Sequence, residues 1–399
     1  MTARRRVLIS GASIAGPTLA FWMDRAGWDV TVIERAPELR TGGQNIDIRG
    51  AGREVARRMG VEEAIRARNT HEVGTRFIGG RGQTVASFPA GRDDTGGATA
   101  ELEILRGELS RVLFDLIADR VVFRFGTTIR SLDDRATDSQ VGFDDGSDEL
   151  FDLVVIAEGM RSRTRRLVFP GIDPIVSKNM STAYLTIPRT PDDTDWWRWY
   201  SAVGGRSVTL RPDNLGTIRA TLSYPTRGDE RTDTGDDTAG DVRAGLRERF
   251  ADAGWEASRV LREMTDTDEL YLDRVGQVHL DTWHRGRVAL VGDAAYCASP
   301  LSGMGTTLSL VGAYVLAGEL GRSNDVDTAL QRYEDVLRPF VERAQDLPPG
   351  TPRLANPRSR AGIAIFHGVL RAAASRAGRR VTAGLFRPPA DTFELPDYE

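Results

Sequence analysis

The segment that most constrains the fold is a strand, a tight turn and a helix near the N-terminus. Residues 7–9 form a short apolar run that leads to Gly11, which is typical of a buried parallel strand. Apolar and small residues then recur at helical spacing over residues 14–26, and a glycine ends the predicted helix. A second strand, residues 29–33, follows directly and ends on Glu34. The sequence therefore predicts a βαβ unit with a glycine-containing first turn.

The turn, GASIAG from Gly11 to Gly16, differs from the G-x-G-x-x-G dinucleotide fingerprint only in having Ser13 at the middle position. Gly11 permits the tight turn, Gly16 lets helix and strand pack closely, and the helix N-terminus offers free N–H groups to a pyrophosphate. Glu34 follows about 20 residues later, where a carboxylate accepts hydrogen bonds from ribose hydroxyls. The hydroxyl of Ser13 can itself face a phosphate. A purely structural βαβ turn is the alternative interpretation.

Composition narrows the class of protein. With 399 residues, of which 40% are hydrophobic and 28% charged, the chain is expected to form two or three soluble domains. A net charge of −4 gives no case for nucleic acid binding. One cysteine, Cys297, excludes an internal disulfide, and four scattered histidines predict no metal site. Because we find neither a signal peptide nor a spanning segment, we expect a cytoplasmic protein without stable membrane association.

Two further segments have the form of an apolar strand followed by a polar turn. The first is DLVVIAEGMRSRTRR, residues 152–166, in which the strand leads to Glu158 and Gly159. The second is residues 287–320, in which a strand ends at Gly292 and Asp293 before a long apolar helix. Asp293 can accept hydrogen bonds from a chain of hydroxyls like that of a sugar. The glycines before the helix let its backbone approach a flat ring closely.

The order of these three motifs resembles the FAD-dependent aromatic hydroxylase family, the single-component flavoprotein monooxygenases of the para-hydroxybenzoate hydroxylase type. The resemblance covers roughly Val7 to Arg338. It implies that the first motif binds the ADP half of FAD, the second serves FAD and the nicotinamide cofactor, and the third holds the ribityl chain. The chain departs from the family at Glu158, which replaces the usual aspartate, and at Tyr296, where many relatives have histidine.

Two shorter stretches are most similar to the tetracycline-inactivating branch of that family. They are GGQNIDIRG, residues 42–50, which lines the flavin in the branch, and LRGEL, residues 105–109, whose arginine contacts FAD. The resemblance implies no obligate catalytic side chain, and we predict no metal. Carried over residue by residue, it implies FAD contacts at Gly11, Ser13, Ala15, Gly16, Glu34, Arg35, Gln44, Asp47, Arg106, Glu158, Gly159, Gly292, Asp293, Pro300, Gly303, Met304, Gly305 and Thr306.

The resemblance and the strand patterns together predict a domain organisation. The expected fold is α/β, with a Rossmann-like FAD-binding domain, a mainly antiparallel substrate-binding sheet and a C-terminal helix. We assign residues 1–70, 98–170 and 270–340 to the FAD-binding domain, residues 71–97 and 171–269 to the substrate-binding domain, and residues 341–399 to a C-terminal helical segment. Strand-like runs are predicted at residues 181–188, 197–203, 206–211 and 217–224, helices at 241–250, 256–264, 325–344 and 360–386, and a mobile loop at 226–241.

The implied activity is that of an FAD-dependent monooxygenase. In the family, NADPH or NADH reduces non-covalently bound FAD, and O₂ then forms a flavin hydroperoxide that oxygenates the substrate. We expect a planar phenolic or polycyclic aromatic substrate, polyketide-like or tetracycline-like, bound by a monomer or homodimer. Arg206 and Arg219 are candidate substrate contacts on predicted strands, with surface arginines as the alternative. The aromatic residues at 196–200 are predicted either to stack on the substrate or to pack the sheet.

Other functions use the same cofactor motifs. An FAD-dependent reductase or oxidase needs the same contacts, so it stays an alternative. A non-catalytic FAD-binding sensor is a second alternative, disfavoured because a scaffold does not need the third motif. A flavin-dependent halogenase needs a lysine beside the flavin, whereas the lone Lys178 lies outside the motifs.

Overall fold

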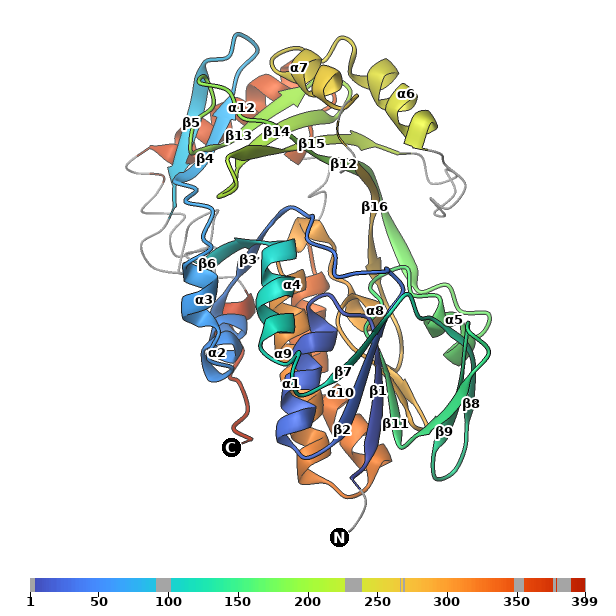
Figure 1. Ribbon diagram of the computed structural model, residues 1–399. Helices are drawn as coiled ribbons and strands as arrows, with labels where there is room; N and C mark the ends of the chain where they lie inside the picture. Colours follow the sequence, from blue (N-terminus) through green and yellow to red (C-terminus); the bar gives the residue numbers. More distant parts are fainter. Residues whose placement is uncertain are drawn as a thin grey trace.

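A six-stranded sheet carries the first βαβ unit in the lower part of the molecule (Figure 1). The structure is a computed structural model that describes residues 4–90, 102–226, 239–265, 267, 270–347, 355–375, 378 and 389–398. The strand order is β17-β18-β11-β1-β2-β7, and only the β17–β18 pair is antiparallel among these described strands. The strands are β1 (Arg6–Ser10), β2 (Asp29–Glu34), β7 (Val122–Phe125), β11 (Leu153–Ile156), β17 (His284–Arg285) and β18 (Val288–Leu290).

Helices cover one side of this sheet and a small second sheet covers the other (Figure 1). Strand β11 and residues 7–9 of β1 consist of buried apolar residues, as expected for parallel strands covered on both faces. The predicted strand-turn-helix-strand order of the first unit is confirmed. The helices on one side are α1 (Ala15–Arg25), α9 (Gly305–Arg322) and α10 (Val326–Gln345), and the second sheet contains β8 (Ile129–Asp134), β9 (Ser139–Phe143) and β10 (Asp148–Phe151).

A two-stranded sheet lies between the six-stranded sheet and the upper part of the molecule (Figure 1). β3 lies within the stretch 42–50 that resembles the tetracycline-inactivating branch, and β6 ends at Leu105, the first residue of the stretch 105–109; Asn45 pairs with Leu105 in antiparallel register. The elements here are β3 (Asn45–Ile48), α2 (Gly50–Arg58), α3 (Glu62–Arg66), β6 (Leu102–Leu105) and α4 (Arg106–Asp115).

The upper layer is a seven-stranded sheet in the order β16-β12-β15-β14-β13-β4-β5. The four strands predicted between residues 181 and 224 are confirmed, and all described neighbours except β13 and β4 are antiparallel. The strand at Tyr271–Val278 also pairs with this sheet, although we assigned its residues to the lower domain. The strands are β4 (Gly74–Ile78), β5 (Thr84–Pro89), β12 (Ile175–Pro188), β13 (Trp197–Ala202), β14 (Arg206–Pro212), β15 (Thr217–Pro225) and β16 (Tyr271–Val278).

The two faces of the seven-stranded sheet meet different parts of the molecule. Helices α6 (Ala239–Phe250) and α7 (Ala257–Glu263) cover the upper face, where Val208 and Leu222 belong to one core with Phe250. Side chains alternate along a strand, so the residues next to Val208 and Leu222 in sequence point down toward the two-stranded sheet. We call the face covered by α6 and α7 the outer face, and the face toward the two-stranded sheet the inner face.

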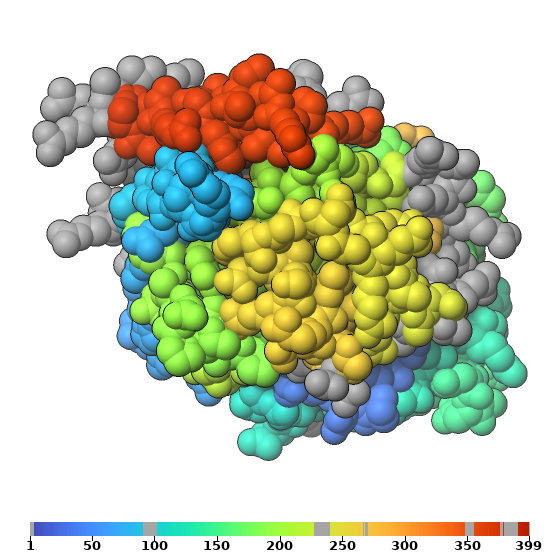
Figure 2. All heavy atoms as spheres, turned by 90° about the horizontal axis from the view of Figure 1, so that it is seen from above, coloured from blue at the N-terminus to red at the C-terminus, as the bar shows by residue number. Residues whose placement is uncertain are grey.

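The C-terminal helix α12 (Arg360–Ala374) lies beside β4 and β5 (Figure 2). It begins where predicted and ends earlier, since Ser375 is extended, and residues 379–388 lie outside the described residues. Most of the predicted loop at 226–241 also lies outside them. None of the described helices combines the length and the apolar character that crossing a membrane requires.

Candidate active site

The turn after β1 has the geometry that a dinucleotide-binding turn requires. Gly11 has φ +116°, and a Cβ atom there would lie 2.4 Å from the carbonyl oxygen of Ala157. A Cβ atom on Gly16 would lie 1.9 Å from the carbonyl oxygen of Gly11. The expected tight turn and close packing are therefore confirmed. No side chain caps the N-terminus of α1, so the N–H groups of its first turn have no side-chain acceptor.

Polar side chains gather around this turn. Glu34 accepts hydrogen bonds from the backbone N–H of Ala12 at 3.0 Å and from that of Ala36 at 2.9 Å. The hydroxyl of Ser13 accepts a hydrogen bond of 3.3 Å from Nη2 of Arg106. The structure thus brings three predicted cofactor residues together from β2, the turn and α4. Arg35, the residue after β2, is exposed.

The two stretches taken from the tetracycline-inactivating branch form one wall beside the turn. The backbone N–H of Arg106 donates to the carbonyl oxygen of Gln44 at 3.0 Å. A Cβ atom on Gly107 would lie 1.7 Å from the carbonyl oxygen of Thr41, so only glycine allows this approach. Two segments that are far apart in sequence are therefore held in direct contact.

The third motif packs against the first. Gly292, with φ +65°, would bring a Cβ atom to 3.0 Å from the Cβ of Ala15. Asp293 begins the short helix α8 (Asp293–Tyr296), and burial raises the pKa of its carboxyl while Arg106 acts in the opposite direction. Ser299 has φ +72°, and its buried hydroxyl has no partner in the described part of the chain. A buried hydroxyl without a partner, in a turn with an unfavourable backbone conformation, is suited to hydrogen-bond with a polar ligand.

The remaining residues of the third motif lead into α9. Pro300 is exposed and begins the 3₁₀ turn η2 (Pro300–Ser302), and Gly303 is left-handed with φ +64°. Met304 is buried, and α9 begins at Gly305, within the stretch 303–306 near which we predicted the helix to begin; no side chain caps that start. Thr306, in the first turn, is 9% exposed.

Tyr296 and Cys297 follow Asp293 and are both buried, and the thiol of Cys297 interacts with the carboxyl of Asp293. Tyr296, the departure from the usual histidine, is buried in the core with its hydroxyl 3.1 Å from that of Tyr333. Cys297 is a buried free thiol, and burial raises its pKa well above the ordinary value. In the described residues, no group of three or more His, Cys, Asp or Glu side chains could hold a metal ion.

The second motif ties elements together. Glu158 accepts hydrogen bonds from the hydroxyls of Ser10 at 2.6 Å, Ser162 at 2.7 Å and Thr164 at 2.5 Å. The carboxylate of Glu158 therefore links the end of β1 to the start of α5 (Thr164–Val168). Gly159 follows with φ +83°. The contact of this pair with FAD and the nicotinamide cofactor stays a prediction.

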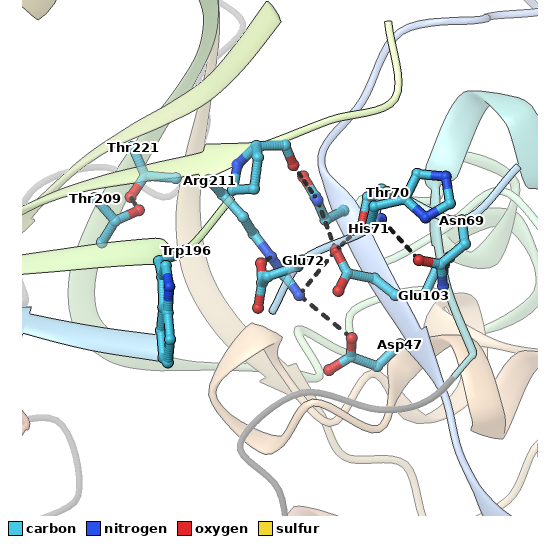
Figure 3. Close-up of polar contacts among 12 residues, drawn as sticks. Asp47, Asn69, Thr70, His71, Glu72, Glu103, Trp196, Thr209, Arg211 and Thr221 are labelled. Carbon is cyan, nitrogen blue, oxygen red and sulfur yellow. Dashed lines mark hydrogen bonds and ion pairs between the residues drawn. The ribbon is translucent and has the colours of Figure 1, made fainter. Parts of the chain in front are cut away.

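A buried arginine of the seven-stranded sheet forms ion pairs with the two-stranded sheet (Figure 3). Arg211 of β14 lies 2.6 Å from Glu72, 3.2 Å from Glu103 of β6 and 3.4 Å from Asp47 of β3. Asp47 also accepts a hydrogen bond from Arg49 at 3.1 Å. Burial raises the pKa of Glu72 to about 8, although Arg211 opposes that shift. The predicted cofactor residue Asp47 is thus part of an ionic junction.

The inner face of the seven-stranded sheet is aromatic at its ends and hydroxylated between them. Tyr184, Thr221, Thr209 and Trp199 are neighbours in register across β12, β15, β14 and β13. The hydroxyls of Thr209 and Thr221 lie 2.7 Å apart (Figure 3). The indole N–H groups of Trp197 and Trp199 are buried without a partner among the described residues. Part of the predicted aromatic cluster therefore faces the cofactor motifs.

The two candidate substrate arginines lie on opposite faces of the sheet. Arg219 is on the inner face, where it donates to Asp213 at 2.9 Å and to Thr186 at 2.6 Å. Arg206 is on the outer face, paired with Asp252 at 2.6 Å. It lines a cavity of about 430 Å³ between the β13–β14 turn, the α6–α7 connection and α12. Only Arg219 therefore faces the cofactor motifs.

Our sequence reasoning missed three residues on which the charge of Arg106 acts, namely Tyr184, Tyr271 and Asp273. Tyr271 and Asp273 lie on the inner face of β16, and the charge of Arg161 also acts on both of them. The rings of Tyr184 and Tyr271 stack with centroids 6.4 Å apart. Their two-residue spacing puts Tyr271 and Asp273 on one face of a strand, but the sequence carries no sign of which face meets the cofactor motifs.

Comparisons with known proteins agree with the arrangement of these motifs. A family model described as an FAD binding domain matches residues 4–347. The FAD-dependent monooxygenase asL4 of Sarocladium schorii is 35% identical over 98% of each chain, and the flavin-dependent monooxygenase eupH of Phoma sp is 35% identical over 98% of this chain and 97% of its own. The crystal structure of tetracycline destructase Tet(51) superposes with a TM-score of 0.80 at 31% identity, covering 100% of both chains.

Proposed function

Because this chain belongs to the FAD-binding domain family and is an FAD-dependent monooxygenase, we propose that it hydroxylates a planar phenolic or polycyclic aromatic compound. The family is that of the flavin monooxygenases of the para-hydroxybenzoate hydroxylase type. NADPH or NADH and O₂ are the proposed co-substrates. The observation that carries the substrate class is the inner face, on which Tyr184 and Trp199 flank the hydroxyls of Thr221 and Thr209.

The residues present fit FAD. The glycine turn and the uncapped start of α1 would hold the pyrophosphate, and Glu34 would hold the ribose. Asp293 would hold the ribityl chain, and the orphaned hydroxyl of Ser299 offers a further polar contact. When bound, FAD supplies the redox chemistry, which takes two electrons from the nicotinamide cofactor and passes one atom of O₂ to the substrate.

The protein contributes the positions of the reacting groups and the electrostatic field around them. The uncapped N-terminus of α9 places fixed positive dipoles beside the predicted ring site, where they stabilise negative charge without reorganisation. The buried indole N–H groups of Trp197 and Trp199 are donors that match the carbonyl and hydroxyl oxygens of a polyketide-like ring system. Stacking on aromatic side chains suits a flat substrate and excludes water from it.

The similarity to tetracycline destructase Tet(51) supports the same substrate class. Its 31% identity extends over the whole chain, so it includes the seven-stranded sheet as well as the cofactor motifs. We therefore include tetracycline among the compounds to be tested, together with simple phenols and hydroxylated anthraquinones.

The test follows flavin reduction and product formation with this panel. A substrate is expected to accelerate reduction of the flavin by NADPH or NADH and to yield a product one oxygen atom heavier, labelled from ¹⁸O₂. Replacing both Trp197 and Trp199 with Phe should weaken that stimulation on the order of tenfold, since two donors are lost. Trp196→Phe is the matched control. Turnover that is indifferent to O₂, with unlabelled product, would contradict hydroxylation and favour a reductase.

A further inference from the structure

Asp273 is a buried acid of the inner face, and it has no role in the function proposed above. It pairs in register with Thr182 of β12, and its neighbour Leu272 packs into the core of the outer face. Because side chains alternate along β16, the carboxylate of Asp273 points to the inner face. Tyr271, two residues earlier on that face, stacks on Tyr184. The acid therefore stands at the end of an aromatic wall.

The carboxylate of Asp273 has no hydrogen bond or ion pair with any residue that the structure describes, although only 9% of the residue is exposed. Buried carboxylates are normally paired, because removing an unpaired charge from water is costly. Its cross-strand neighbour Thr182 follows the usual pattern, since its hydroxyl lies 2.9 Å from that of Ser223. Because no described residue donates to this largely buried carboxylate, the acceptor is open to a donor from a ligand.

The groups around Asp273 come from several elements. Arg161 follows β11, Arg106 begins α4 and Asp293 begins α8. Burial raises the pKa of Asp273, the charge of Arg161 lowers it, Asp293 raises it and Arg106 lowers it, and the net direction is upward. Burial also raises the pKa of the hydroxyls of Tyr184 and Tyr271. The ionised carboxylate is therefore a stronger proton acceptor than an ordinary aspartate.

We propose that Asp273 recognises the acidic hydroxyl of the aromatic substrate, accepting its hydrogen bond and then its proton. The proposal rests on the proposed function, because it assigns a residue to the substrate of that site. A phenol has the single O–H donor that this acceptor lacks, and its ring can lie against the wall formed by Tyr184 and Tyr271.

The proton moves from the hydroxyl oxygen of the substrate to a carboxylate oxygen of Asp273. The O–H bond of the phenol breaks and a new O–H bond forms on the carboxylate, leaving a phenolate and a neutral carboxylic acid. The phenolate ring is richer in electrons, so it reacts more readily with electrophilic oxygen. A methyl ether has no such proton, so Asp273 also selects phenols over their ethers.

The test compares binding of 6-cyano-2-naphthol, a planar phenol that ionises in mildly alkaline solution, with that of its methyl ether. Both are titrated into the oxidised FAD-loaded wild type, Asp273→Asn and Asp252→Asn, at pH values below and above the pKa of the phenol. Asp252 is the matched control because its side chain is 78% exposed and lies on the outer face. No nicotinamide cofactor is present, so no turnover occurs.

Below the pKa of the phenol, Asp273→Asn should bind it on the order of tenfold more weakly than the wild type, since a charge-assisted hydrogen bond is lost. Above that pKa the order should reverse, because the ionised acid repels the phenolate and the amide does not. The methyl ether should bind both proteins equally, and Asp252→Asn should behave as the wild type throughout. A purely structural role for Asp273 would not produce the reversal.

Equal binding of the phenol by the wild type and Asp273→Asn at both pH values would overturn the proposal. So would an effect that the methyl ether shares, or the absence of saturable binding of the phenol to the wild type. A lower FAD affinity in Asp273→Asn would overturn it as well, by making the acid a cofactor contact. Because the assay needs no reaction, a panel that yields no ¹⁸O-labelled product would contradict the proposed function separately.

Discussion

At the scale of the residue, acids near the cofactor motifs are distinguished by their hydrogen-bond donors. Both carboxylate oxygens of Glu158 accept hydrogen bonds from hydroxyls, and Glu34 accepts hydrogen bonds from two backbone N–H groups. Asp293 and Asp273 instead have raised pKa values caused first by burial. An acid whose donors come from the protein is a structural link, whereas Asp273, to which no described residue donates a hydrogen bond, is open to a donor from a ligand.

Asp293→Ala should purify with most of its flavin lost, because the predicted acceptor for the ribityl hydroxyls is removed. The ratio of flavin to protein absorbance in the purified variant measures this loss. Tyr296→Phe is a suitable control, since it removes only a buried hydroxyl three residues away that contacts Tyr333, and it should keep its flavin. Stoichiometric FAD at wild-type affinity in Asp293→Ala would mean that the third motif is misassigned.

Glu34→Ala should weaken FAD binding by about 1–3 kcal/mol, the range for hydrogen bonds to a charged group. Fluorescence titration of the apoprotein with FAD measures the change. Arg106→Ala should change affinity in the same direction, because its guanidinium reaches Ser13 in the turn. Asp29→Ala removes an exposed acid at the opposite end of β2 from Glu34 and serves as the control. Unchanged affinity in both test variants would show that the cofactor lies elsewhere.

At the scale of the element, helix α9 depends on one close contact. A Cβ atom on Gly312 would lie 1.8 Å from the hydroxyl of Tyr296, which is itself fully buried against Tyr333. The glycine therefore lets α9 pack over α8 and hold its own N-terminus beside the cofactor motifs. The same helix contains Gly321, which has open space around it.

Gly312→Ala should destabilise the protein by about 1–3 kcal/mol, the usual cost of overpacking a core. Gly321→Ala, in the same helix, should be neutral or stabilising by up to about 1 kcal/mol from helix propensity. Adding Tyr296→Phe to Gly312→Ala removes the clashing hydroxyl and should recover part of the loss. Urea denaturation measures all four proteins, and equal effects at the two glycines would contradict this packing argument.

The elements that could be predicted from sequence are those specified by local patterns. The turn from Gly11 to Gly16 and a helix start near residues 303–306 carry their own glycine and periodicity signals, and the structure has both, with α9 beginning at Gly305. The pairing of β16 with β12 and the opposite orientations of Arg206 and Arg219 depend on contacts between distant strands. Period-two alternation defines two faces but not which one meets the other domain, so Asp273 could not be found from sequence.

At the scale of the whole molecule, the junction around Arg211 connects the seven-stranded sheet to the two-stranded sheet beside the cofactor motifs (Figure 3). Arg211 faces the carboxylates of Glu72, Glu103 and Asp47, of which Asp47 also pairs with Arg49. Burial of the Glu72 side chain is the first cause of its raised pKa, and the charges of Glu103 and Asp47 add to it, so Glu72 holds its proton to about pH 8. The contact between the two layers is therefore sensitive to pH in the neutral range.

Glu72→Gln should flatten the dependence of stability on pH. The pKa of Glu72 is raised from 4.5 to about 8 in the folded protein, so the native state binds more protons than the unfolded state between these values. The free energy of unfolding of the wild type must then fall as pH rises through this window, by up to about 1.4 kcal/mol per pH unit from this group. Glutamine does not titrate, so the variant gains on the wild type as pH increases. Urea denaturation at saturating FAD, from pH 5 to pH 8, measures the difference.

Glu54→Gln is the control for that experiment, because hydrogen bonds from Arg57 lower the pKa of Glu54 to about 2. Its folded-state pKa is depressed, so its contribution is fully present above the ordinary glutamate range and is lost only as pH falls toward 2. Between pH 5 and pH 8 the difference between Glu54→Gln and the wild type should therefore stay constant. The contrary outcome is that the free energies of unfolding of Glu72→Gln and Glu54→Gln, each relative to the wild type, change with pH in the same way. Proton binding at Glu72 would then not govern the junction, and the ionised form of the cluster would be stable on its own.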